Sequence, residues 1–438
     1  MEKKLIFIQL NEINFDLVEK YIAGSKKDKF PNLFYIKKNF KNFLTYSENQ
    51  YEKLEPWIQW PSVYLGKEYV DHKIFRLGDI VNHPEQKQIF EIIEEKGFTV
   101  GAISPMNAEN RLKKQVYFIP DPWTNTNSDK SSFSKRLSLM LKQTVNDNAS
   151  NRLSFKSILT ILEIIFRTFH FKKTLFLLKM IFSAFIKSWK KSLVLDYMIH
   201  LIHLKLLKEK NPNFSTIFFN SGAHIQHHYF YNTKFLSNLP KNPEWYINSS
   251  FDPIEDMLEV YDQIIGDYLN LNKEKNLLIS TGLQQVPFKK IQFYYRLKNH
   301  LLFMKSIGIK CSNILPRMTR DFEIIFDNNN NLIKAQKILK NIKLNRDNLN
   351  IFNEIEVRNK SLFVTLTYPN EIKKNDYVIV NDDLKLNFFN EVVFVAIKNG
   401  MHDTGGYVFS TPHTDLEIPK EKVHVSKIHN IILNYFKI

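Results

Sequence analysis

Short apolar runs alternate with stretches of helical spacing along this chain. Leu5–Leu10 is apolar apart from Gln9, which predicts a buried strand, and a helical pattern follows at 15–22. The other predicted strands are 98–103, 215–220 and Asn276–Ser280, and a helix at 89–96 is predicted to end at Gly97. This strand–helix–strand rhythm favours a mostly parallel sheet covered by helices.

Polar, small-residue loops follow three of the predicted strands. They begin after Leu10, Asn220 and Ser280. Ligands of open α/β sheets bind where strands end, so these loops are the first places to expect a functional site.

The segment 155–210 has helical spacing throughout and contains neither Pro nor Gly. From Arg152 to Lys191 it carries nine Lys or Arg and a single acid, Glu163, with aromatic residues interleaved. Two interpretations stay open: a helical cap on the core with a solvated basic face, or a basic amphipathic surface that lies on anionic lipid. The preceding polar residues, 126–150, are expected to form a loop or linker.

The pattern of apolar and polar residues changes between about 290 and 390. Predicted strands at 361–367 and Tyr377–Val380 indicate an inserted α+β region there. A further strand at 391–397 leads into the polar run Asn399 to Gly406. The expected organisation is therefore a first core part (1–125), a basic helical insertion or cap (126–210), a second core part (211–290), the α+β insertion (291–390) and a C-terminal core part (391–438).

Composition narrows the class of protein. The net charge of +16 over 438 residues favours anionic partners, and the single Cys311 excludes an intrachain disulfide. The apolar run at the N-terminus is too short for a signal peptide or a membrane span, so a cytoplasmic protein is expected, peripheral to the inner membrane if the basic helices touch lipid. Phosphate loops, dinucleotide fingerprints and nucleic-acid-binding modules are not recognisable, so nucleic acid is not an expected partner.

Histidines gather directly after two predicted strands. His224, His227 and His228 follow Asn220, and His402 follows the strand at 391–397. Histidines at i and i+4 share a helix face, which is a common spacing for metal ligands, and imidazole is a preferred ligand of zinc. Helix capping and buried hydrogen bonds are the alternative roles.

Other candidate functional residues lie directly after the first predicted strand and at the end of the Trp- and Pro-rich run 55–62. Asn11 and Glu12 are potential ligands or acid–base groups, although Asn and Asp in this stretch also suit a helix N-cap. Ser62 is a nucleophile only if a metal or a base activates it.

The order of these motifs resembles the alkaline phosphatase superfamily, in its type I phosphodiesterase/nucleotide pyrophosphatase branch. The matching segments are 5–16, 56–66, 224–228, 280–283 and 400–402. The resemblance implies an α/β fold with a central, mostly parallel sheet flanked by helices, with the basic helices and the 291–390 region as insertions. The sequence also resembles bacterial members of this superfamily that are associated with surface polysaccharide or lipid modification.

The resemblance places one metal at His224, His228 and His402. The second metal would need the positions of Asn11, Thr281 and Gly282, which are poor ligands, so a single three-His centre holding one divalent ion, zinc by preference, is expected. Such a centre predicts that the three rings converge to within about 4 Å.

The expected function is hydrolysis or transfer of an anionic phosphoester by this reduced centre. Ser62 and Glu12 are the catalytic candidates, and Asn11, Gln59, Gln284 and Gln285 are the substrate-binding candidates. The alternative is a catalytically inactive relative that binds a glycan, a lipid headgroup or a partner protein at the position of the family's active site.

Overall fold

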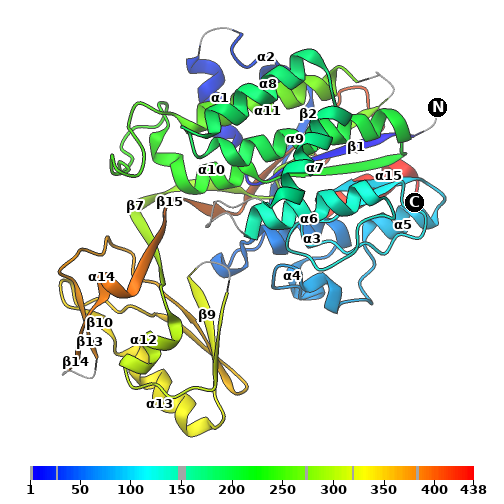
Figure 1. Cartoon of the computed structure of the whole chain (residues 1–438). Helices are drawn as coiled ribbons and strands as arrows, with labels where there is room; N and C mark the ends of the chain where they lie inside the picture. Colours follow the sequence, from blue (N-terminus) through cyan, green and yellow to red (C-terminus); the bar gives the residue numbers. More distant parts are fainter. Residues whose placement is uncertain (1–2, 26–27, 147–153, 272–274, 318–319, 381–383) are drawn as a thin grey trace. The chain divides into compact units, whose positions relative to one another are not determined.

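The computed structural model describes residues 3–25, 28–146, 154–271, 275–317, 320–380 and 384–438 (Figure 1). The chain divides into two compact units. Unit 1 comprises Met1–Ser237, Ser250–Val286 and Gly400–Ile438, and unit 2 comprises Asn238–Ser249 and Pro287–Asn399.

Unit 1 is built on an eight-stranded sheet in the order β17-β2-β16-β6-β1-β5-β3-β4. The five neighbours β6, β1, β5, β3 and β4 are parallel, whereas β16 is antiparallel to both β6 and β2. The strands are β1 (Leu5–Leu10), β2 (Lys41–Tyr46), β3 (Val100–Ile103), β4 (Tyr117–Ile119), β5 (Phe214–Phe219), β6 (Asn276–Ser280), β16 (Gly405–Ser410) and β17 (Val423–His424). The predicted mostly parallel sheet is confirmed, with strand ends shifted by one or two residues.

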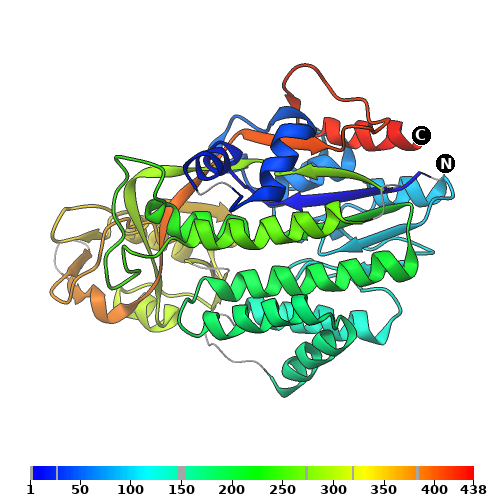
Figure 2. The ribbon, with the colours of Figure 1, turned by 90° about the horizontal axis from the view of Figure 1, so that it is seen from above.

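Helices cover both faces of this sheet (Figure 2). Helices α3 (Pro56–Leu65), α5 (Ile89–Glu95) and α15 (Lys427–Phe436) share one core with Leu5 and Phe7 of β1. Successive side chains of a strand point to opposite faces, so Ile6 and Ile8 are buried on the other side. The remaining helices of unit 1 are α1 (Phe15–Gly24), α2 (Pro31–Asn39), α4 (Tyr69–His72), α6 (Ser132–Asn146), α7 (Phe155–Arg167), α8 (Phe171–Ala184), α9 (Lys190–Lys210), α10 (Ser221–Tyr229) and α11 (Pro253–Leu269).

Helix α6 falls in the segment that was predicted to be a loop. Its buried residues Leu137, Met140 and Leu141 repeat at helical spacing among polar neighbours. This apolar stripe packs α6 on β4 and outweighs the Ser- and Asn-rich composition that suggested a loop.

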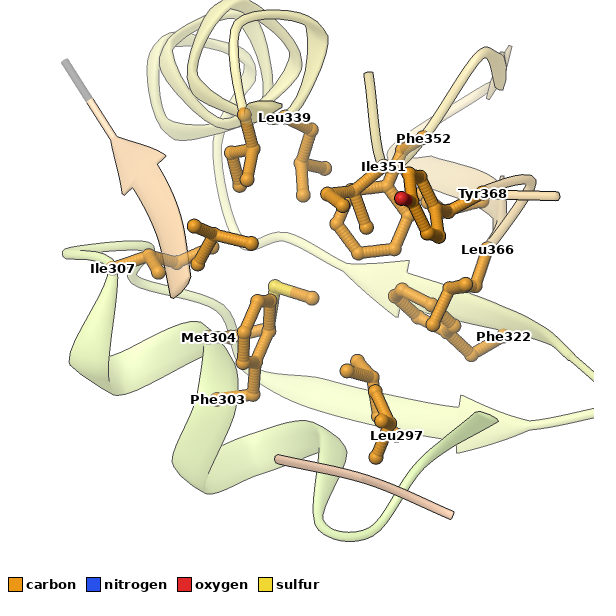
Figure 3. Packing of buried hydrophobic residues seen from close by; sticks show 14 of the residues in the cluster. Leu297, Phe303, Met304, Ile307, Phe322, Leu339, Ile351, Phe352, Leu366 and Tyr368 are labelled. Atoms are coloured by element: carbon orange, nitrogen blue, oxygen red, sulfur yellow. The ribbon is translucent and has the colours of Figure 1, made fainter. Parts of the chain in front are cut away.

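Unit 2 has its own core (Figure 3). Phe303, Met304, Phe322 and Phe352 are almost fully buried at its centre. Its sheets are β11-β12-β9-β8, β10-β13-β14 and the pair β15-β7. The elements are β7 (Gln284–Leu297), α12 (His300–Ser306), β8 (Asn313–Pro316), β9 (Asp321–Ile325), α13 (Asn329–Lys340), β10 (Lys343–Leu344), β11 (Glu354–Arg358), β12 (Ser361–Thr365), β13 (Tyr377–Val380), β14 (Leu384–Asn387), α14 (Phe388–Glu391) and β15 (Val392–Asp403).

Candidate metal centre

Several chain segments of unit 1 meet at the carboxyl edge of the parallel sheet. Strand β1 lies between β5 and β6, so the loops after Leu10, Phe219 and Ser280 are neighbours. The end of β15, from Gly400 to Asp403, reaches the same place, because His227 contacts the Gly400 carbonyl. Side chains from these four segments therefore lie close together at this edge of the sheet.

Glu12 is the buried acid of this edge, with 1% of its surface exposed. Its backbone has φ of 61°, a left-handed conformation that is uncommon outside glycine and costs free energy, so the surrounding structure must hold it. The loop holds it there: Glu12 N–H donates to Thr281 O over 3.0 Å, and Gln226 Nε2 donates to Glu12 O over 2.7 Å. Amides of Asn11 and Gln285 donate to the carboxylate.

Two histidines face this carboxylate. The Nε2 atom of His227 lies 3.4 Å from Glu12 Oε2, and His402 Nε2 lies 3.3 Å from the same oxygen. The two Nε2 atoms are 3.1 Å apart. Three ligating atoms from three distant parts of the sequence thus converge, and they form the one group of this kind in the described ranges.

A hydrogen bond on Nδ1 directs Nε2 of His227 towards the centre, and a carboxylate lies near Nδ1 of His402. His227 Nδ1 donates to the Gly400 carbonyl over 2.9 Å, because a carbonyl only accepts, and this leaves the Nε2 lone pair of the neutral ring facing Glu12. His402 Nδ1 lies 3.6 Å from a carboxylate oxygen of Glu55. Metal-binding histidines in proteins commonly have such a partner on the second nitrogen.

The distances fit a metal ion. Ligand atoms about 2.0–2.2 Å from an ion are about 2.8–3.1 Å apart in octahedral and about 3.3–3.6 Å apart in tetrahedral coordination. The observed 3.1, 3.3 and 3.4 Å lie within that span. Two imidazoles and one carboxylate form a donor set typical of catalytic zinc and of non-haem iron.

The approach to this group is partly open. The side chains of His227 and His402 are 16% and 10% exposed, and that of Glu55 is 26% exposed. The half-exposed ring of Tyr51 stacks on His402 with centroids 6.5 Å apart. The two histidines and Glu55 are therefore not sealed off from solvent in unit 1.

The three-His set is not brought together. His402 is at the centre, but the converging group contains His227 and Glu12 in place of His224 and His228. His224 and His228 lie against each other, with ring centroids 4.7 Å apart. Helix α10 docks on the β1 loop through Gly222 and Gln226, and His227 is the histidine of this helix whose Nε2 faces Glu12.

Ser62 lies in the middle of α3 and is fully buried. Its hydroxyl donates to Ile58 O over 3.1 Å and lies 2.9 Å from His72 Nε2. Since His72 Nδ1 accepts from Ile74 N–H, the ring proton is on Nε2, and His72 donates to Ser62 instead of acting as its base. The structure thus gives Ser62 a structural network and no activating base.

Three of the four predicted substrate-binding residues are buried, and only Gln284 is partly exposed. Asn11 and Gln285 belong to the scaffold of Glu12: Asn11 Nδ2 also donates to Asn220 Oδ1, and its Oδ1 accepts from Trp60 Nε1. Gln59 is buried and donates to Lys53 O. Gln284 is partly exposed, donating to Asp403 Oδ2 over 2.8 Å and accepting from Tyr407 OH.

Sequence reasoning placed His227 in the right cluster but did not select it as a ligand. His224 and His228, at i and i+4, matched a familiar ligand spacing, whereas His227 is i+3 from His224.

A cavity of about 240 Å³ lies elsewhere, among Tyr117, Arg167 and Lys205, and none of the candidate ligands lines it.

Comparison with known proteins gives structural likeness only. No family model matches the chain, and no curated protein matches its sequence. Similar solved structures include phosphonoacetate hydrolase from Sinorhizobium meliloti (10% identity, TM-score 0.45, 99% of this chain and 96% of that one) and alkaline phosphatase from the Antarctic bacterium TAB5 (10%, 0.42, 100% and 99%). Murine ectonucleotide pyrophosphatase/phosphodiesterase 5 is a third (10%, 0.42, 100% and 96%).

At these identities and TM-scores the likeness says nothing about the activity, ligands or substrate of this chain.

Proposed function

We propose that this protein is a metal-dependent hydrolase of a phosphoester, with one divalent ion held by Glu12, His227 and His402. The observation that carries the proposal is the convergence of two Nε2 atoms and a carboxylate oxygen at 3.1–3.4 Å. A buried carboxylate costs free energy unless a positive charge or hydrogen bonds compensate it, and a divalent ion supplies that charge.

A divalent ion with three protein ligands supplies Lewis acidity towards a phosphoryl oxygen and activates water for attack. The chain's own residues position this chemistry. Glu55 and the Gly400 carbonyl orient the two rings, and the amides of Asn11 and Gln285 fix the carboxylate of Glu12. Because Ser62 is buried and donates to backbone, we propose direct attack by water rather than a covalent intermediate.

An anionic ester is the proposed substrate class. The net charge of +16 draws anions to the protein, and the partly exposed Gln284 at the same sheet edge offers an amide group to a substrate oxygen.

The first test is the metal content of the purified protein, beside two neighbouring histidine variants. We expect an equimolar divalent ion in the wild type and in His228→Ala, and its loss in His227→Ala. A screen of phosphomonoesters, phosphodiesters and carboxylic esters then follows, with hydrolysis expected to track the bound ion. Retention of the ion in His227→Ala, or its loss only in His228→Ala, would contradict the ligand set.

A second function rests on a separate observation. Asn11 stands where the resemblance expects a ligand Asp, and Ser62 is not available as a nucleophile. Both departures suit a relative that binds an anionic ligand without hydrolysing it. A tightly held ion with no turnover of any ester, together with saturable binding of a phosphoester, would favour this function over the hydrolase.

A further inference from the structure

Helix α7 carries its apolar stripe on the outside. Phe155, Ile158, Leu159, Leu162 and Phe166 are spaced at i, i+3, i+4, i+7 and i+11, and their exposed fractions run from 44% to 84%. The opposite side of the helix buries Ser157 and Thr160 together with Ile164. A helix of a water-soluble surface has the reverse arrangement, with apolar residues inward and polar ones outward.

Helix α8 repeats this inversion. Phe171, Leu175, Leu178 and Phe182 form one exposed stripe, and Phe185 and Ile186 extend it past the helix end with 82% and 83% exposure. Figure 2 shows both helices outside α9, on the side of unit 1 that faces away from the central sheet. Scattered exposed apolar residues are ordinary, but two adjacent stripes on consecutive helices mark an interaction surface.

Basic residues flank the two stripes. At about 100° per residue, Lys156 and Arg167 of α7 lie about 100–120° around the helix from the centre of its stripe. Lys172 and Lys179 of α8 lie about 70–90° from the centre of theirs. All four are exposed, which allows their long side chains to extend towards the same plane as the aromatic rings.

The charge of this surface is one-sided. Residues 155–191 contain eight Lys or Arg and one acid, Glu163, and that acid pairs with Arg136 and Arg167. Lys173, Lys187 and Lys190 pair with acids of α11. Within the described ranges, Lys156, Lys172 and Lys179 form no ion pair with an acid, so their charges are available to an anionic partner.

We propose that α7 and α8 form a docking surface for the anionic headgroup and acyl boundary of a lipid bilayer. An apolar stripe rich in Phe and Leu, flanked by lysines, is the pattern of helices that lie in the membrane interface. No helix of the described ranges has the length and apolar character to cross a bilayer, so the contact is lateral. A symmetric contact between two copies would instead bring one basic surface against another.

The test is co-flotation of the full-length protein with vesicles, either of phosphatidylcholine alone or with added phosphatidylglycerol. We expect binding to the anionic vesicles at about 0.1 M salt and weaker binding at about 1 M, where the Debye length falls from about 10 to about 3 Å. Substituting Phe166, Phe182 and Phe185 together by Ser should abolish flotation. Substituting Lys172 and Lys179 by Gln should weaken it about 25-fold, at about fivefold per charge.

Matched controls keep the result specific. The triple Phe34→Ser/Leu301→Ser/Leu302→Ser and the pair Lys305→Gln/Lys310→Gln remove exposed residues of the same kinds elsewhere, and both should float like the wild type. Circular dichroism and thermal midpoint check that the variants are folded. Equal binding to neutral and anionic vesicles, flotation unchanged in the Phe triple, or self-association that the Phe triple removes without any vesicle binding would each overturn the proposal.

Discussion

The substitution Gly400→Ala should weaken metal binding although it removes no ligand. A Cβ at this position would lie 2.3 Å from Gln285 Oε1 and 2.8 Å from the backbone oxygen of Gln226. Real Cβ contacts are essentially never shorter than 3.0 Å, so something must move. Gln285 and Gln226 are the residues that hold Glu12, and the carbonyl of Gly400 itself accepts from His227.

The expected magnitude follows from these two contacts. The end of the Gln285 side chain is able to rotate away, at the cost of its hydrogen bond to Glu12, but the Gln226 oxygen belongs to the backbone of α10. Overpacking of this kind costs about 1–3 kcal/mol of stability. Loss of the groups that orient metal ligands typically lowers metal affinity by about 10–100-fold.

The assay is competition for zinc with a chromophoric chelator, beside urea unfolding of the metal-free protein. Gly97→Ala is the control: a Cβ there meets nothing within 4 Å, although Gly97 has φ of 87°, a left-handed conformation that alanine adopts only with strain. It should lose stability and keep its zinc affinity. A folded Gly400→Ala protein with wild-type zinc affinity would refute the assignment of this loop as the support of the metal ligands.

Two other predictions concern Glu55, beside the candidate metal centre, and His72, in the buried network of Ser62. Glu55→Gln should lower zinc affinity by about tenfold, at the lower end of the effect of orienting residues, because Glu55 lies 3.6 Å from His402 Nδ1; equal affinity in the chelator assay would remove Glu55 from the site. Burial lowers the pKa of His72 from 6.5 to about 3, so the unfolded chain binds the proton first and the protein should lose about 2 kcal/mol of stability between pH 7.5 and pH 5; urea unfolding of His72→Gln should lack this part of the pH dependence.

Strands β1, β3, β5 and β6 were predictable because each is a short apolar run followed by polar residues, whereas β2, β4, β16 and β17 of the same sheet were not predicted; β2 alternates exposed and buried residues and β17 has two residues. The position of Glu12 was predictable for the same reason: it directly follows β1, and the centre of a parallel sheet places such a loop beside its neighbours. Helix α6 was missed because its composition is polar and only the spacing of Leu137, Met140 and Leu141 indicates a buried face.

The proposed ligand set could not be predicted from residue spacing, because it depends on how α10 is rotated about its axis. Gly222 and Gln226 share the face that docks on the β1 loop, where a Cβ at Gly222 would lie 2.1 Å from Ile13 and Gln226 donates to Glu12.

At about 100° per residue, His227 lies about 100° from Gln226, whereas His224 and His228 lie about 160–200° from it. Of the three histidines of α10, His227 lies nearest in angle to this docking face, and its Nε2 is the one that faces Glu12. A helix can satisfy a ligand spacing on any of its faces, and residue spacing does not say which face meets a neighbouring loop; here Gly222 and Gln226 lie on the face that docks on the β1 loop.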